Sequence, residues 1–132
     1  MEVTNGEIYT ARGSLQIMVG MKLPVKVSFQ VAKLAVKLSE PFGVVETVKN
    51  GLIRTYGVED EYKNVEIIAP NDLRGRPVSP NWEKYASEFD ELMAQTQELE
   101  IEKIQLPSMI DGKPLQIEPS ILIALGKFIS VV

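Results

Sequence analysis

The stretch VSFQVAKLAVKL, residues 27–38, decides the fold. Its apolar residues recur every three or four positions, which is the period of an α-helix. One apolar face comprises Val27, Val31, Leu34, Ala35 and Leu38. A second apolar face comprises Phe29, Ala32 and Val36. A helix with two apolar faces is expected to lie at the centre of a protein, covered on both sides.

Helical patterns also flank this stretch. We expect an earlier helix to begin after Asn5, whose side chain is suited to accept a free backbone N–H group. Downstream, Pro41 is expected to stop or kink the central helix, with Ser39 placed to cap a fresh start. A further apolar stripe runs over residues 42–56, and Gly57 is expected to end it in the left-handed conformation. Residues 5–57 therefore form a helical N-terminal half.

The C-terminal half, residues 58–132, mixes short strands with helices. A strand is predicted at 65–67, a loop at 70–80, and a helix from Ser79 as N-cap to about residue 96. Residues 98–102 alternate like a half-buried strand, with a bulge at 102–103. Asp111-Gly112 is a turn signal before a returning strand at 113–117, and Pro119 opens a last helix whose inner face would hold Leu122, Leu125, Phe128 and Ile129. We predict one α+β domain, 1–132, mostly helical with a small antiparallel sheet.

The composition excludes several classes of enzyme. The 132 residues contain no cysteine and no histidine, so thiolate nucleophiles, thiolate metal sites and histidine general bases are all missing. No glycine-rich phosphate loop is present. Trp82, Tyr85 and Phe89 have the spacing of packing residues rather than of a sugar-binding platform. We expect no enzymatic activity, no cofactor and no metal.

No part of the sequence indicates a membrane. The first residues lack the basic and apolar regions of a signal peptide, and no apolar stretch reaches the roughly 20 residues of a membrane-spanning helix. We therefore expect a soluble protein that remains in the cytoplasm.

Charge is distributed unevenly along the chain. The net charge is +3 over residues 1–57 and −7 over residues 58–132. Lys26, Lys33 and Lys37 lie on one helical face and could bind phosphates. Alternatively they form a solvated face, or they pair across a helix contact with three acidic residues, Glu83, Asp90 and Glu91. The isoelectric point of about 4.9 argues against nucleic acid as the partner.

The motif Arg74-Gly75-Arg76-Pro77 is the strongest single candidate for a binding site. Two guanidinium groups on a glycine-containing loop can clamp a phosphate or a carboxylate. The alternative is a surface loop that only aids solubility. Arg74 and Arg76, together with the three lysines, are the predicted binding residues.

The carboxylates Glu98, Glu100 and Glu102 share one face of the predicted strand. Alternate residues of a strand are nearly 7 Å apart, which is too wide for one metal ion without other ligands. An exposed acidic face that discourages edge pairing is the favoured interpretation.

Four short motifs resemble a small, uncharacterised family of phage and prophage proteins. They are Asn5-Gly6-Glu7, Lys22-Leu23-Pro24-Val25-Lys26, Leu52-Ile53-Arg54-Thr55-Tyr56-Gly57 and Ile121-Leu122-Ile123-Ala124-Leu125. The resemblance implies a viral or prophage origin and the cytoplasm of a bacterial host, with association with the virion as a further option. It supplies no catalytic or binding residues, and the stretch 71–78 departs from it.

These observations lead to two expected functions. The first is a non-catalytic phage protein that binds another protein, either in virion assembly or as a modulator of a host protein. The second is a binder of an anionic small molecule, such as a nucleotide signal, through Arg74, Arg76 and the lysines. The two-faced helix at 27–38 also leaves room for a homo-oligomer.

Overall fold

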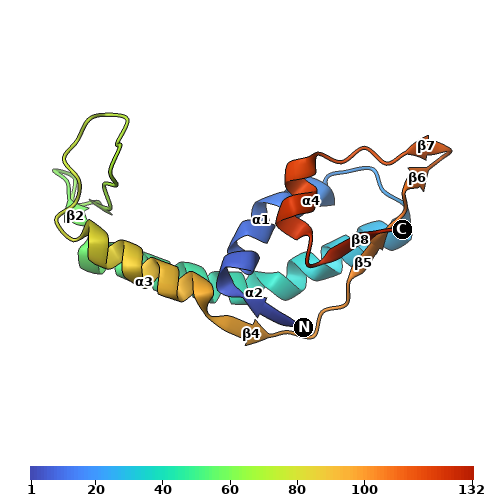
Figure 1. Cartoon of the computed structure of the whole chain (residues 1–132), viewed down its shortest axis with the longest axis horizontal. Helices are drawn as coiled ribbons and strands as arrows, with labels where there is room; N and C mark the ends of the chain where they lie inside the picture. The colour runs from blue at the N-terminus through green and yellow to red at the C-terminus, as the bar shows by residue number, and fades with distance from the viewer.

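The computed structural model describes all residues, 1–132, and has an α+β fold with four helices and eight short strands. The helices are α1 (Asn5–Val19), α2 (Val25–Tyr56), α3 (Trp82–Ala94) and α4 (Pro119–Leu125). The strands are β1 (Glu2–Thr4), β2 (Val58–Glu59), β3 (Val65–Glu66), β4 (Thr96–Glu98), β5 (Ile104–Leu106), β6 (Met109–Ile110), β7 (Lys113–Pro114) and β8 (Ile129–Val131). Helix α2 runs along most of the molecule, with α1 packed on its first half and α3 on its second (Figure 1).

Helix α2 is continuous over 32 residues, with Pro41 inside it, so the predicted stop and restart at Ser39 is wrong. A proline removes one backbone hydrogen bond and crowds the preceding turn. Packing on both sides of Pro41 offsets this cost, because α1 lies beside the first half of α2 and α3 lies beside the second (Figure 1).

The body of the molecule, defined here as residues 1–42 and 95–132, contains the hydrophobic core. Fifteen buried side chains from α1, the first half of α2, α4, β1, β5 and β8 form one cluster, with Phe128, Leu106 and Leu125 fully buried. Helix α4 begins at Pro119 as predicted but ends at Leu125, so Phe128 and Ile129 reach the core from beyond the helix, and Leu122 is only half-buried.

Helix α1 begins one residue earlier than predicted. Thr4 is the N-cap, and its hydroxyl accepts from the backbone N–H of Glu7 while the Glu7 carboxylate accepts from the backbone N–H of Thr4. Asn5 is instead buried, and its side-chain amide donates to the carbonyl oxygen of Leu92, at 2.9 Å. Asn5 therefore joins α1 to α3 rather than capping α1.

The strands form four separate two-stranded pairs instead of one small sheet. Three pairs are antiparallel: β1 with β4, β2 with β3, and β6 with β7. The fourth pair, β5 with β8, is parallel, with Ile104 opposite Ile129. Asp111 and Gly112 both have positive φ and form the predicted turn, but the returning strand covers only β7. Residues 99–103 are irregular, so the predicted bulge is absent.

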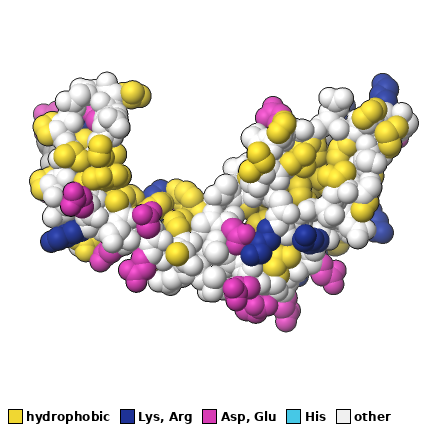
Figure 2. All heavy atoms as spheres, viewed as in Figure 1, with side chains coloured by type: hydrophobic (Ala, Val, Ile, Leu, Met, Phe, Trp, Pro, Cys, Tyr) yellow, Lys and Arg dark blue, Asp and Glu magenta, His cyan; other side chains and the backbone are white.

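The arm, defined here as residues 43–94, projects from the body. It consists of the second half of α2, α3 and the connecting segments, and a hollow separates its end from the body (Figure 2). Helix α3 is preceded by Asn81 and not by the predicted cap Ser79. Gly57 is extended and not left-handed, yet glycine is required there because a Cβ atom would lie 2.5 Å from the carbonyl oxygen of Ile53.

None of the four helices combines the length and the apolar character needed to cross a membrane.

Candidate functional site

The predicted binding residues fall on two separate surfaces. Arg74 and Arg76 lie at the end of the arm, beyond the C-terminal end of α2, whereas the three lysines lie on the half of α2 that belongs to the body. Lys37 is 19 residues from the end of α2, which corresponds to about 28 Å along a helix axis. The arginines and the lysines therefore cannot contact one small ligand together.

The tip loop, residues 69–78, is closed at its base by two hydrogen bonds. The backbone N–H of Ile68 donates to the hydroxyl oxygen of Ser79 at 2.7 Å, and the backbone N–H of Ser79 donates to the carbonyl oxygen of Ile68 at 2.9 Å. Ser79 was predicted to cap α3, but its side chain is buried and its hydroxyl closes the loop instead. The loop therefore has a fixed base.

Arg76 fixes the interior of the tip loop. Its Nε and Nη2 atoms each donate to the carboxylate of Asp72 at 3.1 Å, and Nη1 donates to the carboxylate of Glu66 in β3. The hydrogen bonds from Arg76 lower the pKa of Asp72 to about 2. Planar, two-point contacts between arginine and a carboxylate are strong and directional. Arg76 thus ties the tip loop to the β2–β3 hairpin.

Arg74 and Leu73 differ from Arg76, because they face solvent. Arg74 forms no ion pair, and the Leu73 side chain is fully exposed, at 103% of its reference area. Tyr62, in the neighbouring hairpin turn, is also exposed. The two arginines therefore have different positions: one holds the loop together and the other remains available at its surface. Sequence reasoning missed Leu73, since a single leucine in a polar loop carries no periodic signal.

A row of aromatic rings links the arm to the body. Contacts between neighbouring rings run from Trp82 through Tyr85, Phe89 and Tyr9 to Phe42, with centroids 5.7 to 6.5 Å apart. All five side chains are half-buried. The ammonium group of Lys49 donates to the Tyr9 hydroxyl at 2.6 Å, and this bond raises the pKa of Lys49. Packing is the expected role of the α3 rings, and the row joins α1, α2 and α3.

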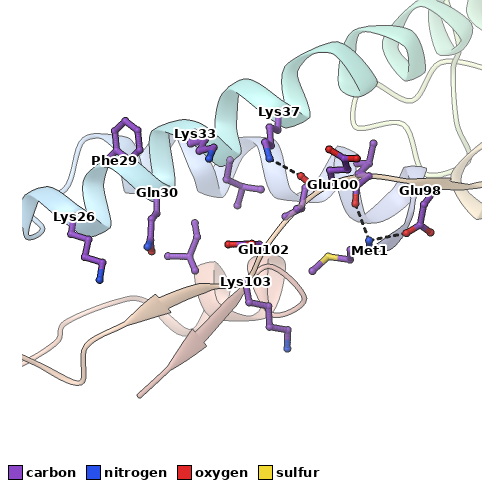
Figure 3. Close-up of a pocket in the computed structure, with 14 residues that line it drawn as sticks. Met1, Lys26, Phe29, Gln30, Lys33, Lys37, Glu98, Glu100, Glu102 and Lys103 are labelled. Atoms are coloured by element: carbon purple, nitrogen blue, oxygen red, sulfur yellow. Dashed lines mark hydrogen bonds and ion pairs between the residues drawn. The ribbon is translucent and has the colours of Figure 1, made fainter.

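The three lysines line a groove on the body, called here the lysine groove. It has a volume of about 720 Å³ and lies between α2 and the segment 98–104 (Figure 3). Lys37 donates to the carbonyl oxygen of Glu100 at 2.6 Å, whereas Lys26 and Lys33 form no ion pair. The alternative pairing with Glu83, Asp90 and Glu91 does not occur within the chain, because α3 lies along the other half of α2 (Figure 1).

The opposite wall of the groove carries the three carboxylates Glu98, Glu100 and Glu102. Glu98 accepts from the N-terminal amine of Met1 at 2.9 Å, and Glu100 and Glu102 also line the groove. No three acidic side chains of the chain come close enough together to hold a metal ion. The groove therefore has one cationic wall and one wall that combines three glutamates with Lys103.

Comparison with protein-family models, curated proteins and solved structures finds no match to this chain.

Proposed function

We propose that this protein has no catalytic role and acts by binding another protein through the end of its arm. The proposal rests on the structure of the tip loop. Hydrogen bonds and ion pairs at Ser79 and Arg76 fix this loop, and Leu73 within it is fully exposed. The side chain of Leu73 contributes nothing to the core, because all of it is accessible to solvent. It is therefore free to enter an apolar pocket of a partner protein.

The physical basis is preorganisation. A loop that is already fixed in its bound conformation loses little conformational freedom on binding, so more of the contact energy contributes to affinity. Binding energy in protein interfaces is concentrated in a few anchors, among which tyrosine and arginine are enriched. Leu73, Arg74 and Tyr62 would be the anchors, with Leu73 entering an apolar pocket and Arg74 meeting a carboxylate or a backbone carbonyl.

The resemblance of four short motifs to phage and prophage proteins suggests which kind of partner the arm would bind. In that setting the partner is a phage structural protein during virion assembly, or a host protein whose activity is modified. The protein would then act in the cytoplasm of a bacterial host, with association with the virion as the outcome of an assembly role.

The test is a comparison of variants in a pull-down from infected or induced host cells. We expect the wild-type chain to retain a partner that the double variant Leu73→Asp, Arg74→Glu loses. The matched control is Ile123→Asp, which changes another strongly exposed aliphatic residue, on α4 in the body. Retention of the partner by the tip variant, or its loss from the control as well, would contradict the proposed surface.

The lysine groove supports a second candidate function, the binding of an anionic small molecule. Lys26 and Lys33 lack ionic partners and border a groove large enough for a nucleotide-sized ligand. A ligand present at 100 times its dissociation constant adds about 2.7 kcal/mol of stability. A thermal-shift screen with mononucleotides and cyclic nucleotides tests this function. A shift that disappears in Lys26→Ala, Lys33→Ala supports it, and no shift at millimolar ligand removes it.

A further inference from the structure

The outward face of α2 carries a regular apolar row that no part of the chain covers. The row, called here the seam, comprises Val25, Phe29, Ala32, Val36, Ser39 and Gly43. All six positions are exposed, with 86% of Val25, 68% of Phe29 and 74% of Val36 accessible to solvent. The second apolar face of this helix, which was predicted to be covered, is therefore not covered by the chain itself.

The spacing of the seam is that of a coiled coil. Its members are separated by four, three, four, three and four residues, which is the alternation of a and d positions in a heptad repeat. The residues that enter the core from the same helix, such as Val31, Leu34 and Leu38, lie on the opposite side. Figure 3 shows Phe29 directed away from Gln30 and Lys26, which face the lysine groove. The seam is thus distinct from the core, and it borders the lysine groove, whose lining includes Phe29.

Gly43 has no explanation within the chain. It lies inside a helix, where glycine is less stable than alanine. A Cβ atom at this position would meet nothing within 4 Å, so the chain's own packing does not require glycine. The missing Cβ atom at Gly43 lets a side chain of a second helix pack directly on the backbone.

We propose that the seam binds the same seam of a second copy, with the two α2 helices antiparallel and related by a two-fold axis near residue 34. A two-fold interface uses one surface patch on both subunits, so the patch must be complementary to itself. In this register Phe29 lies opposite Ser39 of the second copy. Likewise Val36 lies opposite Ala32, and Val25 lies opposite Gly43. Each large side chain therefore meets a small one.

The charges beside the seam favour the antiparallel orientation. Lys26, Lys33 and Glu40 occupy equivalent flanking positions, one residue after each of Val25, Ala32 and Ser39. Antiparallel pairing about residue 34 places Lys26 next to Glu40 of the second copy, twice. Lys33 approaches its own counterpart at the axis, and its long side chain can extend into solvent. A parallel pair would place Lys33 beside uncharged Ser28 and Glu40 beside uncharged Ala35. Only the antiparallel pair thus gains attraction between opposite charges.

The length of the seam determines how strongly we expect two copies to associate. Residues 25–43 extend over about 28 Å of helix, and one helix–helix contact of this length lies at the small end of specific interfaces. We therefore expect a reversible dimer with a dissociation constant in the micromolar range. The two arms would project from opposite ends of the paired helices, so both tip loops would stay free.

Sedimentation velocity of the full chain, from about 1 to 200 µM, tests the dimer. We expect a concentration-dependent shift to twice the monomer mass, and at least a tenfold weaker association in Val36→Glu. Val36 is exposed, so this variant should fold, which circular dichroism verifies. The control Ile123→Glu should dimerise like the wild type. A monomer at every concentration, or a dimer that Val36→Glu leaves intact, overturns the proposal.

Crosslinking tests the register, since the chain has no cysteine of its own. Chains with Ala32→Cys and chains with Val36→Cys are mixed and oxidised. We expect the mixed 32–36 disulfide to exceed both homodisulfides, and Ser87→Cys on α3 to form none above background. Predominant 32–32 and 36–36 disulfides would indicate parallel helices and would overturn the antiparallel seam, as would the absence of crosslinking.

A charge exchange tests the flanking pairs. Lys26→Glu and Glu40→Lys should each weaken association severalfold, because each places like charges together at two symmetric positions. The double variant Lys26→Glu, Glu40→Lys restores opposite charges and should recover most of the wild-type affinity. A double variant that is as weak as the two single changes combined would overturn this register.

Discussion

The body and the arm of this protein bury their apolar side chains to very different extents. The body has a cluster of fifteen buried residues, whereas the arm buries only Val45, Ile68 and Leu92 among its apolar side chains. The aromatic residues of α3 remain half-exposed. Two paired helices without a third layer cannot enclose a core. The arm therefore depends on its attachment to the body.

That attachment consists of a few specific contacts. The edge of the Tyr9 ring packs on Phe89, and the side chain of Asn5 bonds to the backbone of Leu92. At the far end of the arm, ion pairs join Arg76 to Glu66 and Asp72. The buried apolar side chains are thus concentrated in the body. Substitutions in the body should consequently lower the free energy of unfolding more than comparable substitutions in the arm.

The largest effect is expected in the body. Phe128→Ala removes a fully buried ring from the core cluster and should lower the free energy of unfolding by about 3–5 kcal/mol. Chemical denaturation followed by circular dichroism measures the loss. The comparison substitution in the arm is Phe89→Ala, whose half-buried ring should cost distinctly less. Equal losses at the two positions would remove the distinction between body and arm.

A smaller effect is expected where the two regions join. Asn5→Ala leaves the Leu92 carbonyl and the Gln97 side-chain amide without their buried partner, which should cost about 1–3 kcal/mol. Hydrogen exchange should accelerate mainly in α3 and β4, because the arm loses its tie to α1. The nearby control is Gln16→Ala on the exposed face of α1. Uniform acceleration over the whole chain would show that arm and body unfold as one unit.

Much of the fold could be predicted from the sequence, because its helices follow a strong period of three to four apolar residues. The positions of Pro119 and of Asp111-Gly112 were also informative, since both act on their local backbone. The parallel pairing of β5 with β8 could not be predicted, because it joins short strands separated by a helix and carries no local pattern. Helix α2 continues through Pro41 because packing on both sides of the helix outweighs the local preference of proline.

For the candidate sites, the sequence indicated which residues to consider but not their partners or their exposure. The lysine spacing correctly indicated one helical face, but the acidic residues opposite it belong to segment 98–102 and not to α3. Arg76 and Arg74 look equivalent in sequence, and only the folded loop separates them, through Asp72 and Glu66. Exposure of Leu73 and of the seam depends on what the rest of the chain fails to cover. A sequence pattern cannot show which surfaces the rest of the chain leaves uncovered.

The tip loop should respond to pH with little change in global stability. Because folding lowers the pKa of Asp72 to about 2, from about 4 in an unfolded chain, ionised Asp72 favours the folded loop. This contribution is complete above about pH 4 and is lost as the pH falls toward 2. An NMR titration of the Asp72 carboxyl carbon should have its midpoint near 2. In Arg76→Ala the midpoint should rise toward 4, and an unchanged midpoint would rule out Arg76 as the cause.

The smallest effect on stability is expected at Leu73, where the effect on binding should be greatest. Its side chain contacts solvent and no core, so Leu73→Ala should change the free energy of unfolding by less than about 0.5 kcal/mol. The same substitution should weaken partner binding at least tenfold, as truncation of an anchor residue does. A clear loss of stability would mean that Leu73 supports the arm. If neither stability nor partner binding changes, Leu73 is not an anchor, and the proposal that the end of the arm binds a partner is contradicted.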